Sequence, residues 1–213
     1  MTVAVDAMGG DRGPAVAVPA AAAYLKRHAD VALVLVGDRD AIHGALPGGA
    51  LPARCTLVHA PDVVPMDEAP ARALRGRRQS SMWLALDLVR GGQAQACVSA
   101  GNTGALMAIA RHLLRTLEGI ERPAIARFLP NPRGQTLALD LGANTECTPE
   151  QLCQFAIMGA VLVEAVLGRT SPSVGLLNVG TEASKGTDTI HSAATLIAAT
   201  GLNYHGYVEG NDI

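Results

Sequence analysis

The chain has 213 residues, of which 49% are hydrophobic and 3% are aromatic, and its formal net charge is −2. This length can bury a sizeable core, and the composition excludes a disulfide scaffold or a disordered tail. The small negative charge, without a Lys- and Arg-rich run between aromatic residues, argues against nucleic acid as a partner. The start carries no basic and apolar leader, and no apolar run reaches about 18 residues, which predicts a cytoplasmic protein that does not span a membrane.

Short aliphatic runs alternate with longer Ala- and Leu-rich segments. In chain order they predict a strand at 3–6, a helix at 14–28, a strand at 31–36, a helix at 38–46, a strand at 55–59, a helix at 81–90, a strand at 96–99 and a helix at 103–117. Strands at 124–128 and 136–141, a helix at 149–167, a strand at 173–178, a helix at 187–200 and a strand at 203–208 follow. This order predicts an α/β fold with a mainly parallel sheet. No repeat or linker divides it, so we treat residues 1–213 as a single α/β domain.

The strongest local signal is the turn Ser99-Ala100-Gly101-Asn102-Thr103-Gly104, which joins a buried strand to a helix. Small residues let a ligand approach the backbone, and the first N–H groups of a helix are unpaired donors at the positive end of its dipole. We interpret the turn as a site for a phosphate-like anion, with added side-chain donors from Ser99, Asn102 and Thr103. The alternative is a plain strand-to-helix turn with Asn102 or Thr103 as the N-cap. The P-loop lysine and the GxGxxG spacing are both missing, which argues against nucleotide binding.

Three further strand ends carry acidic, amide or glycine residues, at the edge where open α/β sheets bind ligands. Their members are Asp6, Gly9 and Gly10 after the first strand, Asp140 and Asn144 after the strand at 136–141, and Asn178, Glu182 and Lys185 after the strand at 173–178. Each also has a plain structural interpretation. Asp6 would cap its own turn, and Lys185 would form a surface ion pair with Glu182.

The remaining reactive residues give weaker signals. The one basic cluster, Arg72, Arg75, Arg77 and Arg78, would meet an acidic partner or a phosphate, or would be a solvated helix face. The four cysteines and six histidines lack metal-ligand spacing, so we expect no metal. Cys97 would either carry the acyl group covalently or be a buried thiol of the core, and its position in a strand favours the second role.

In this order and spacing, the segments 5–11, 98–105, 119–124, 140–144 and 177–182 make the whole chain resemble the bacterial phosphate acyltransferases of phospholipid synthesis, the PlsX family. The resemblance implies transfer of a long-chain acyl group from acyl carrier protein to inorganic phosphate, without a cofactor or metal. It implies a homodimer with a three-layer α/β/α, Rossmann-like architecture, related to phosphotransacetylases and to isocitrate and isopropylmalate dehydrogenases. It also implies that residues 1–213 are the N-terminal part of a longer architecture, whose remainder carries dimerisation and contact with the inner face of the membrane.

The mechanism we expect is direct attack of phosphate on the thioester, since both reactants are already competent. Backbone N–H groups after Ser99, together with Asn102 and Thr103, would hold the phosphate. Lys185 or Arg78 would offset its charge, and Asp6 or Asp140 would orient donors. Two rivals stay open: a nicotinamide-dependent dehydrogenase on the related fold, and a non-catalytic protein that binds acyl carrier protein through the basic cluster.

Overall fold

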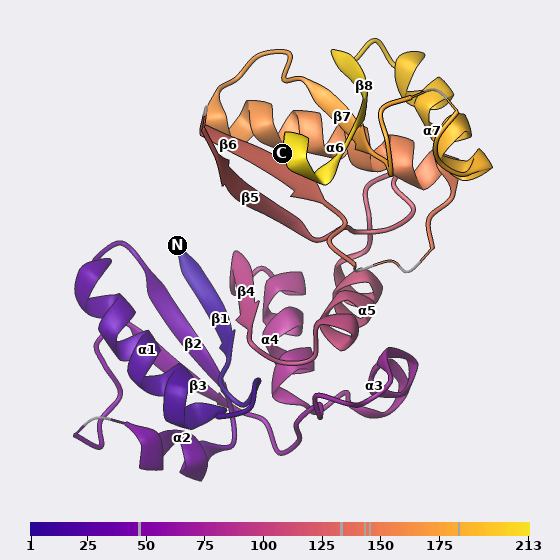
Figure 1. Cartoon of the computed structure of the whole chain (residues 1–213). Coiled ribbons are helices and arrows are strands. Elements are labelled where there is room, and N and C mark those ends of the chain that lie inside the picture. The colour runs from indigo at the N-terminus through magenta and orange to yellow at the C-terminus, as the bar shows by residue number, and fades with distance from the viewer. Residues whose placement is uncertain (47, 133, 143, 145, 183) are drawn as a thin grey trace. The chain divides into compact units, whose positions relative to one another are not determined.

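The computed structural model describes residues 1–46, 48–132, 134–142, 144, 146–182 and 184–213. The chain groups into two compact units, an N-terminal unit (Met1–Arg115) and a C-terminal unit (Thr116–Ile213), shown in Figure 1. The sequence predicts one domain over residues 1–213, whereas in the structure each unit has its own strands and core. The units are therefore described separately.

The N-terminal unit is built on a parallel sheet of four strands in the order β3-β2-β1-β4. Its strands are β1 (Thr2–Asp6), β2 (Ala32–Gly37), β3 (Cys55–His59) and β4 (Ala96–Ser99). Each lies within two residues of its predicted position, because β-branched and aliphatic runs between turn residues are a strong strand signal. The predicted α/β fold with a mainly parallel sheet is confirmed.

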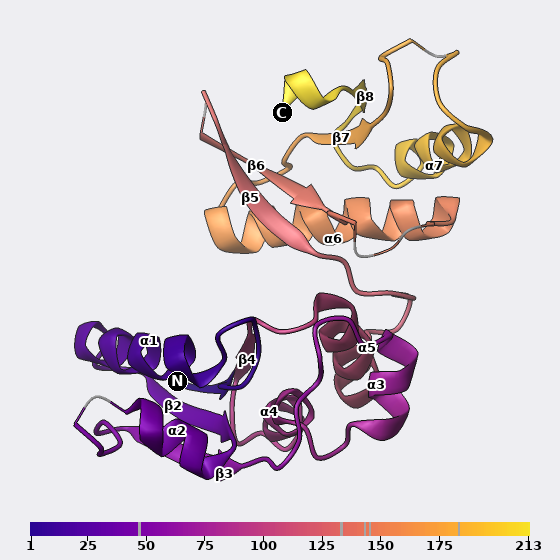
Figure 2. The ribbon, with the colours of Figure 1, turned by 60° about the horizontal axis from the view of Figure 1, so that its bottom comes forward.

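Helices cover both faces of this sheet (Figure 2). They are α1 (Pro14–Arg27) and α2 (Arg39–Ala45) on one face, and α4 (Ser81–Arg90), with α3 (Pro70–Gly76) and α5 (Thr103–Leu114) beside it, on the other. Successive side chains of β1 point to opposite faces: Val3 joins the core under α1 and α2, and Ala4 joins the core under α4. The unit is thus three-layered. The short helix α3 is not among the predicted elements.

The strand order creates a switch in direction beside β1. The chain runs from β1 through β2 to β3, then returns to place β4 on the other side of β1. The helices after β1 and β4 consequently lie on opposite faces of the sheet. In open α/β sheets, ligands bind outside the carboxyl ends of the strands at such a switch point. The ends of β1 and β4 are therefore the place to look for a site.

The C-terminal unit combines a hairpin, two helices and a second pair of strands (Figure 1). Its elements are β5 (Ala126–Asn131), β6 (Gly134–Leu139), α6 (Pro149–Leu167), β7 (Val174–Leu177), α7 (Asp188–Ala198), β8 (Tyr204–Val208) and a 3-10 turn (Gly210–Asp212). β5 and β6 are antiparallel, and β7 and β8 are parallel. Leu176, Ala193 and Ile197 form its buried core.

Helix α6 begins and ends as its sequence predicts. Thr148 and Gln151 form a capping box, Pro149 occupies the first turn, and Gly168 ends the helix in a left-handed conformation. By length and composition alone, this 19-residue helix would be able to cross a membrane. The helix contacts α7, β6 and β7 and buries Phe155, whereas Ile157, Val161 and Val166 are exposed.

Candidate anion-binding site

The carboxylate of Asp6 joins the turns that follow β1 and β4. Asp6 and Ser99 are paired in register, and the Ser99 hydroxyl donates to Asp6 Oδ2 at 2.6 Å. Asp6 Oδ1 accepts the N–H groups of Met8 at 3.2 Å and Gly9 at 3.1 Å. The side chain is buried, with 3% of the residue exposed. The turn-capping interpretation of Asp6 is confirmed, and the structure adds a bond to a second turn.

Ser99 has no hydroxyl proton left for a ligand. Its single proton goes to Asp6, and its oxygen accepts the N–H of Gly101 at 3.0 Å. The structure therefore assigns Ser99 to holding the turn in shape, in place of the side-chain donor role expected from the sequence.

Two glycines allow the turns to touch. A Cβ on Gly9 would lie 2.8 Å from the backbone N of Gly101, a contact that no side-chain movement relieves. Gly10 has φ +84°, and a Cβ there would lie 3.1 Å from the carbonyl oxygen of Ala100. The expected glycine positions are thus required for close approach of two backbones.

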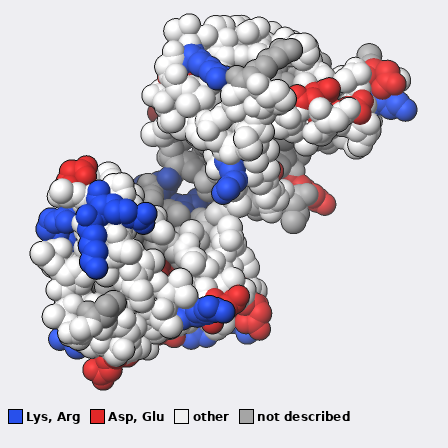
Figure 3. All heavy atoms as spheres, turned by 60° about the vertical axis from the view of Figure 1, so that its left-hand side comes forward, with Lys and Arg blue, Asp and Glu red and all other residues white. Residues whose placement is uncertain are grey.

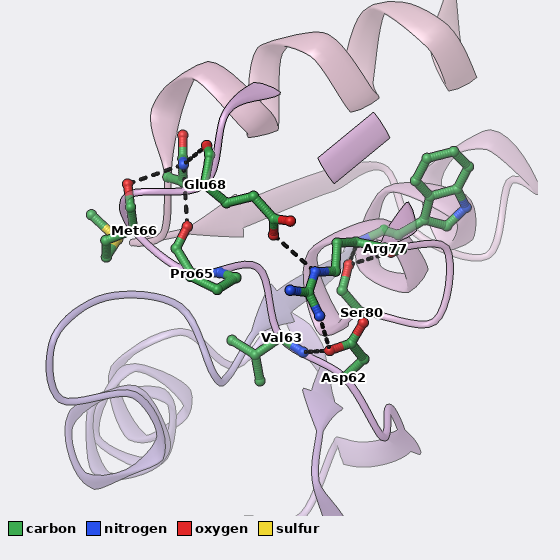
Figure 4. Close-up of polar contacts among 9 residues, drawn as sticks. Asp62, Val63, Pro65, Met66, Glu68, Arg77 and Ser80 are labelled. Atoms are coloured by element: carbon green, nitrogen blue, oxygen red, sulfur yellow. Dashed lines mark hydrogen bonds and ion pairs between the residues drawn. The ribbon is translucent and has the colours of Figure 1, made fainter. Parts of the chain in front are cut away.

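The side chain of Asn102 is fully engaged in hydrogen bonds within the protein, and three of its partners, Pro65, Met66 and Glu68, are labelled in Figure 4. Its Oδ1 accepts the N–H of Ala105 at 3.0 Å, which makes it the N-cap of α5. Its Nδ2 donates to the carbonyl oxygens of Pro65, Met66 and Glu68 at 3.2, 3.0 and 2.8 Å. The N-cap alternative is confirmed, and both amide protons of Asn102 are used by the 65–68 loop. The structure therefore makes Asn102 a positioning residue and corrects the expectation that its side chain donates to an anion.

Arg77 holds the other side of the same loop (Figure 4). Its Nε donates to Glu68 Oε2 at 2.8 Å and its Nη1 to Asp62 Oδ1 at 2.9 Å. Hydrogen bonds to Glu68 and then to Asp62 raise the pKa of Arg77 above its ordinary value. Sequence reasoning missed this role, although two carboxylates a short distance before a basic cluster were an available signal.

The hydrogen-bond donors that stay available to a ligand lie at the start of α5. The backbone N–H groups of Thr103 and Gly104 occupy the first two helical positions, and within the described residues neither they nor the Thr103 hydroxyl has a hydrogen-bond partner. Thr103 and Gly104 are exposed at the carboxyl edge of the sheet. They combine unpaired donors with the positive end of a 12-residue helix, at the switch point between β1 and β4. This is the arrangement that suits an anion.

Arg78 is stacked on an aromatic ring. Its guanidinium carbon lies 5.8 Å from the centroid of the Trp83 ring, and the ring of His112 lies 5.7 Å from the same ring. The structure records no bond between Arg78 and the 99–104 turn among the residues it describes. The guanidinium keeps its charge in this cation–π contact, so the offset of phosphate charge by Arg78 stays a prediction.

The predicted residues Asp140 and Asn144 meet in the C-terminal unit. Asp140 Oδ1 accepts the backbone N–H of Asn144 at 3.2 Å and its Nδ2 at 3.1 Å, and Cys147 Sγ lies 3.5 Å from Asp140 Oδ2. Burial and then the bond to Asp140 raise the pKa of Cys147. A cavity of about 400 Å³ lies alongside, lined by Arg122, Glu146, Cys147, Thr148 and Gln151. The expectation that Asp140 ends a strand of the parallel sheet is wrong, because β6 folds back antiparallel to β5.

Asn178, Glu182 and Lys185 share one loop after β7. Asn178 Nδ2 donates to the carbonyl oxygen of Lys185 at 3.0 Å, and the Lys185 N–H donates to the carbonyl oxygen of Glu182 at 3.0 Å. Among the described residues, Lys185 has no carboxylate within 4.0 Å, so the expected surface ion pair is not formed. Because Asp140 and Lys185 belong to the C-terminal unit, their action beside the 99–104 turn stays a prediction.

Cys97 is protected from acting as a nucleophile. Burial, and next the charge of Asp6, raise the pKa of this thiol from 9.0 to about 12. At pH 8 the thiolate fraction is then about a thousand-fold below that of an ordinary cysteine, so we expect iodoacetamide to modify Cys97 at least about 100-fold more slowly in the folded chain than in guanidinium. Mass spectrometry of the Cys97 peptide measures both rates. Equal rates would show that the thiol is reactive.

The strand order is that of a doubly wound α/β protein, with the glycine-rich 99–104 turn at its switch point. Two solved structures share this fold. EutD phosphotransacetylase from Staphylococcus aureus has a TM-score of 0.66 and 17% sequence identity, and the match covers 98% of this chain and 68% of that one. A branched-chain phosphotransacylase from Enterococcus faecalis V583 has a TM-score of 0.64 and 14% sequence identity, and the match covers 98% of this chain and 67% of that one. The family model described as "Fatty acid synthesis protein" matches residues 1–213, and the chain belongs to this family.

Curated relatives agree with the resemblance seen in the sequence. The chain is 54% identical over 215 residues to a phosphate acyltransferase from Chromobacterium violaceum, covering 100% of this chain and 62% of the relative. It is 55% identical over 212 residues to a phosphate acyltransferase from Paraburkholderia phytofirmans, covering 98% of this chain and 57% of the relative. The chain thus spans about three fifths of the length of these relatives.

Proposed function

We propose that this chain belongs to a phosphate acyltransferase, and that its N-terminal unit holds the inorganic phosphate that attacks an acyl thioester. The acyl donor is acyl carrier protein, and the product is the acyl phosphate used in phospholipid synthesis. The observation that carries the proposal is the set of unpaired donors on Thr103 and Gly104 at the β1–β4 switch point. The names of the relatives at 54% and 55% identity support the reaction class.

The reaction needs positioning more than proton transfer. A phosphate oxygen forms a bond to the thioester carbonyl carbon, the C–S bond breaks, and the carrier leaves as a thiolate that takes a proton from water. Phosphate is already anionic and nucleophilic at neutral pH, so no acyl-enzyme is required. Donors on Thr103 and Gly104 hold the phosphate, while Asp6 and Asn102 keep their turn in place. A Cys97 pKa of about 12 supports direct transfer over a covalent route.

The setting of the enzyme forms part of the proposal. We place it in the cytoplasm as a homodimer, in contact with the inner face of the membrane through parts of the longer relatives that these 213 residues do not cover. Asp140 and Lys185, in the C-terminal unit, are proposed as further catalytic residues. Neither a metal nor a redox cofactor takes part.

Replacing Thr103 with Val tests the phosphate site. Loss of one hydroxyl donor to a charged ligand costs about 1.5–3 kcal/mol, so we expect the Kd for inorganic phosphate to rise at least about 10-fold. Titration calorimetry or phosphorus NMR measures this on the folded chain. Thr56→Val, an exposed threonine on β3, is the matched control and should leave the Kd unchanged. Unaltered phosphate binding by Thr103→Val would place the site elsewhere.

The reaction itself is tested by phosphate-dependent release of thiol from acyl carrier protein thioester. The Chromobacterium violaceum relative serves as the positive control. In that enzyme, valine at the position that aligns with Thr103 should raise the KM for phosphate with little change in the KM for the acyl donor. A dehydrogenase would instead show nicotinamide reduction without thiol release.

A further inference from the structure

Positive charge is concentrated in one stretch of the chain. Residues 69–116, all of them described, contain seven arginines and a single carboxylate, Asp87, although the whole chain has a net charge of −2. On the face drawn in Figure 3, Lys and Arg side chains form several separate groups, one of which lies among Asp and Glu side chains. The basic stretch forms α3, α4 and α5.

Helices α3 and α5 lie side by side and bring these arginines onto neighbouring elements. Ala73 of α3 packs in one core cluster with Ala105 and Ile109 of α5. At their starts, a Cβ on Gly104 would lie 2.9 Å from the Pro70 ring. At their ends, Arg78 and His112 both contact the ring of Trp83. The two helices therefore run in the same direction, with their carboxyl ends together.

Most of these arginines form no ion pair with another described residue. Arg77 pairs with Asp62 and Glu68, and Arg90 pairs with Asp87. Five others are exposed and, within the described part of the chain, have no carboxylate within 4.0 Å. These five, which lie on α3 and α5 or just after their ends, are what we call the α3–α5 basic face: Arg72, Arg75, Arg78, Arg111 and Arg115.

The composition of this face suits a protein partner better than a small ion. Leu114, 43% exposed, lies three residues after Arg111 and directly before Arg115. Apolar and Arg side chains together are typical of protein interfaces, and guanidinium groups bind carboxylates in a bidentate manner. Five unpaired like charges repel one another, and an opposing row of carboxylates relieves that repulsion while speeding encounter. One phosphate ion cannot contact five arginines on two helices.

We propose that the α3–α5 basic face binds the acidic surface of a partner protein. On the proposed function, on which this identity rests, that partner is the acyl carrier protein that delivers the thioester. The face adjoins the 99–104 turn through α5 itself, since Thr103 begins the helix that carries Arg111. A carrier bound there is held on the helix whose first turn holds the phosphate.

Charge reversal tests the face. We expect Arg75→Glu/Arg111→Glu to raise the Kd for acyl carrier protein about 10-fold or more at low salt, with the difference shrinking as salt screens it. The matched control is Lys26→Glu/Arg27→Glu, which makes the same charge change at exposed, unpaired positions on α1 and should shift the Kd less than about 2-fold. Arg78 is left intact because it stacks on Trp83. Equal Kd values for the two double variants would overturn the proposal.

A second measurement separates this proposal from the reaction itself. In the Chromobacterium violaceum enzyme, glutamate placed at the two positions that align with Arg75 and Arg111 should raise the KM for acyl carrier protein thioester about 10-fold and leave thiol release from a small acyl thioester unchanged. Selective loss of carrier binding without any thiol release would refute only the proposed function. If the Arg75/Arg111 variant instead lost binding to phosphatidylglycerol vesicles and kept carrier binding, the face would be a membrane contact and our proposal would fail.

Discussion

Replacing Asp6 with Ala should lower the free energy of unfolding of the N-terminal unit by about 3–5 kcal/mol, the largest effect we expect from a single substitution. The buried carboxylate accepts bonds from Met8, Gly9 and Ser99. Without it, these donors lose a charged acceptor in a site closed to water, which costs more than the loss of the bonds alone. Denaturant unfolding followed by Trp83 fluorescence measures the change, because this single tryptophan is buried in the same unit.

The control for Asp6 is an aspartate with one local bond. Asp38 caps α2 by accepting the N–H of Ala41 at 2.9 Å, so Asp38→Ala should cost about 1 kcal/mol. Phosphate binding should also be lost with Asp6→Ala at temperatures where the unit is still folded, because Asp6 fixes the turn that bears Thr103. A destabilisation no larger than that of Asp38→Ala would mean that Asp6 does not join the two turns.

Replacing Asn102 with Ala should lower the free energy of unfolding by about 2–4 kcal/mol and release the 65–68 loop. The substitution removes the cap of α5 and the amide donor shared by Pro65, Met66 and Glu68. We expect faster thermolysin cleavage next to Met66, which is 51% exposed, as well as a lower denaturant midpoint. Both readouts are needed because the cap and the loop anchor belong to one side chain.

Asn102→Asp separates these two roles. The carboxylate still accepts the N–H of Ala105, so about 1 kcal/mol of cap stability should return, but it cannot donate to the three carbonyl groups. Cleavage next to Met66 should therefore stay fast. Thr103→Val, one residue further on, should change neither stability nor cleavage. Wild-type resistance to thermolysin in Asn102→Asp would show that the amide does not hold the loop.

Many local features of the fold could be predicted from the sequence. The capping box of Thr148 and Gln151, the stop at Gly168 and the strand at 96–99 each depend on residues a few positions apart. The parallel order of the N-terminal sheet followed from the alternation of strands and helices. The antiparallel pairing of β5 and β6 did not, because alternation says nothing about two consecutive strands without a helix between them.

The sequence by itself determined the elements, the glycine-rich turns and the family of this protein, since these depend on local propensity and on motifs in order. The tertiary structure decided which polar groups remain for a ligand. Asp6 accepts the hydrogen bond of the Ser99 hydroxyl, which lies 93 positions away in the sequence. Asn102 donates its side-chain amide to carbonyl groups of a loop 34–37 positions earlier. A donor can serve a ligand only if no internal acceptor reaches it first, and that depends on distances in space. Of the residues predicted for the anion site, Thr103 and Gly104 keep free donors within the described residues, whereas the side chains of Ser99 and Asn102 do not.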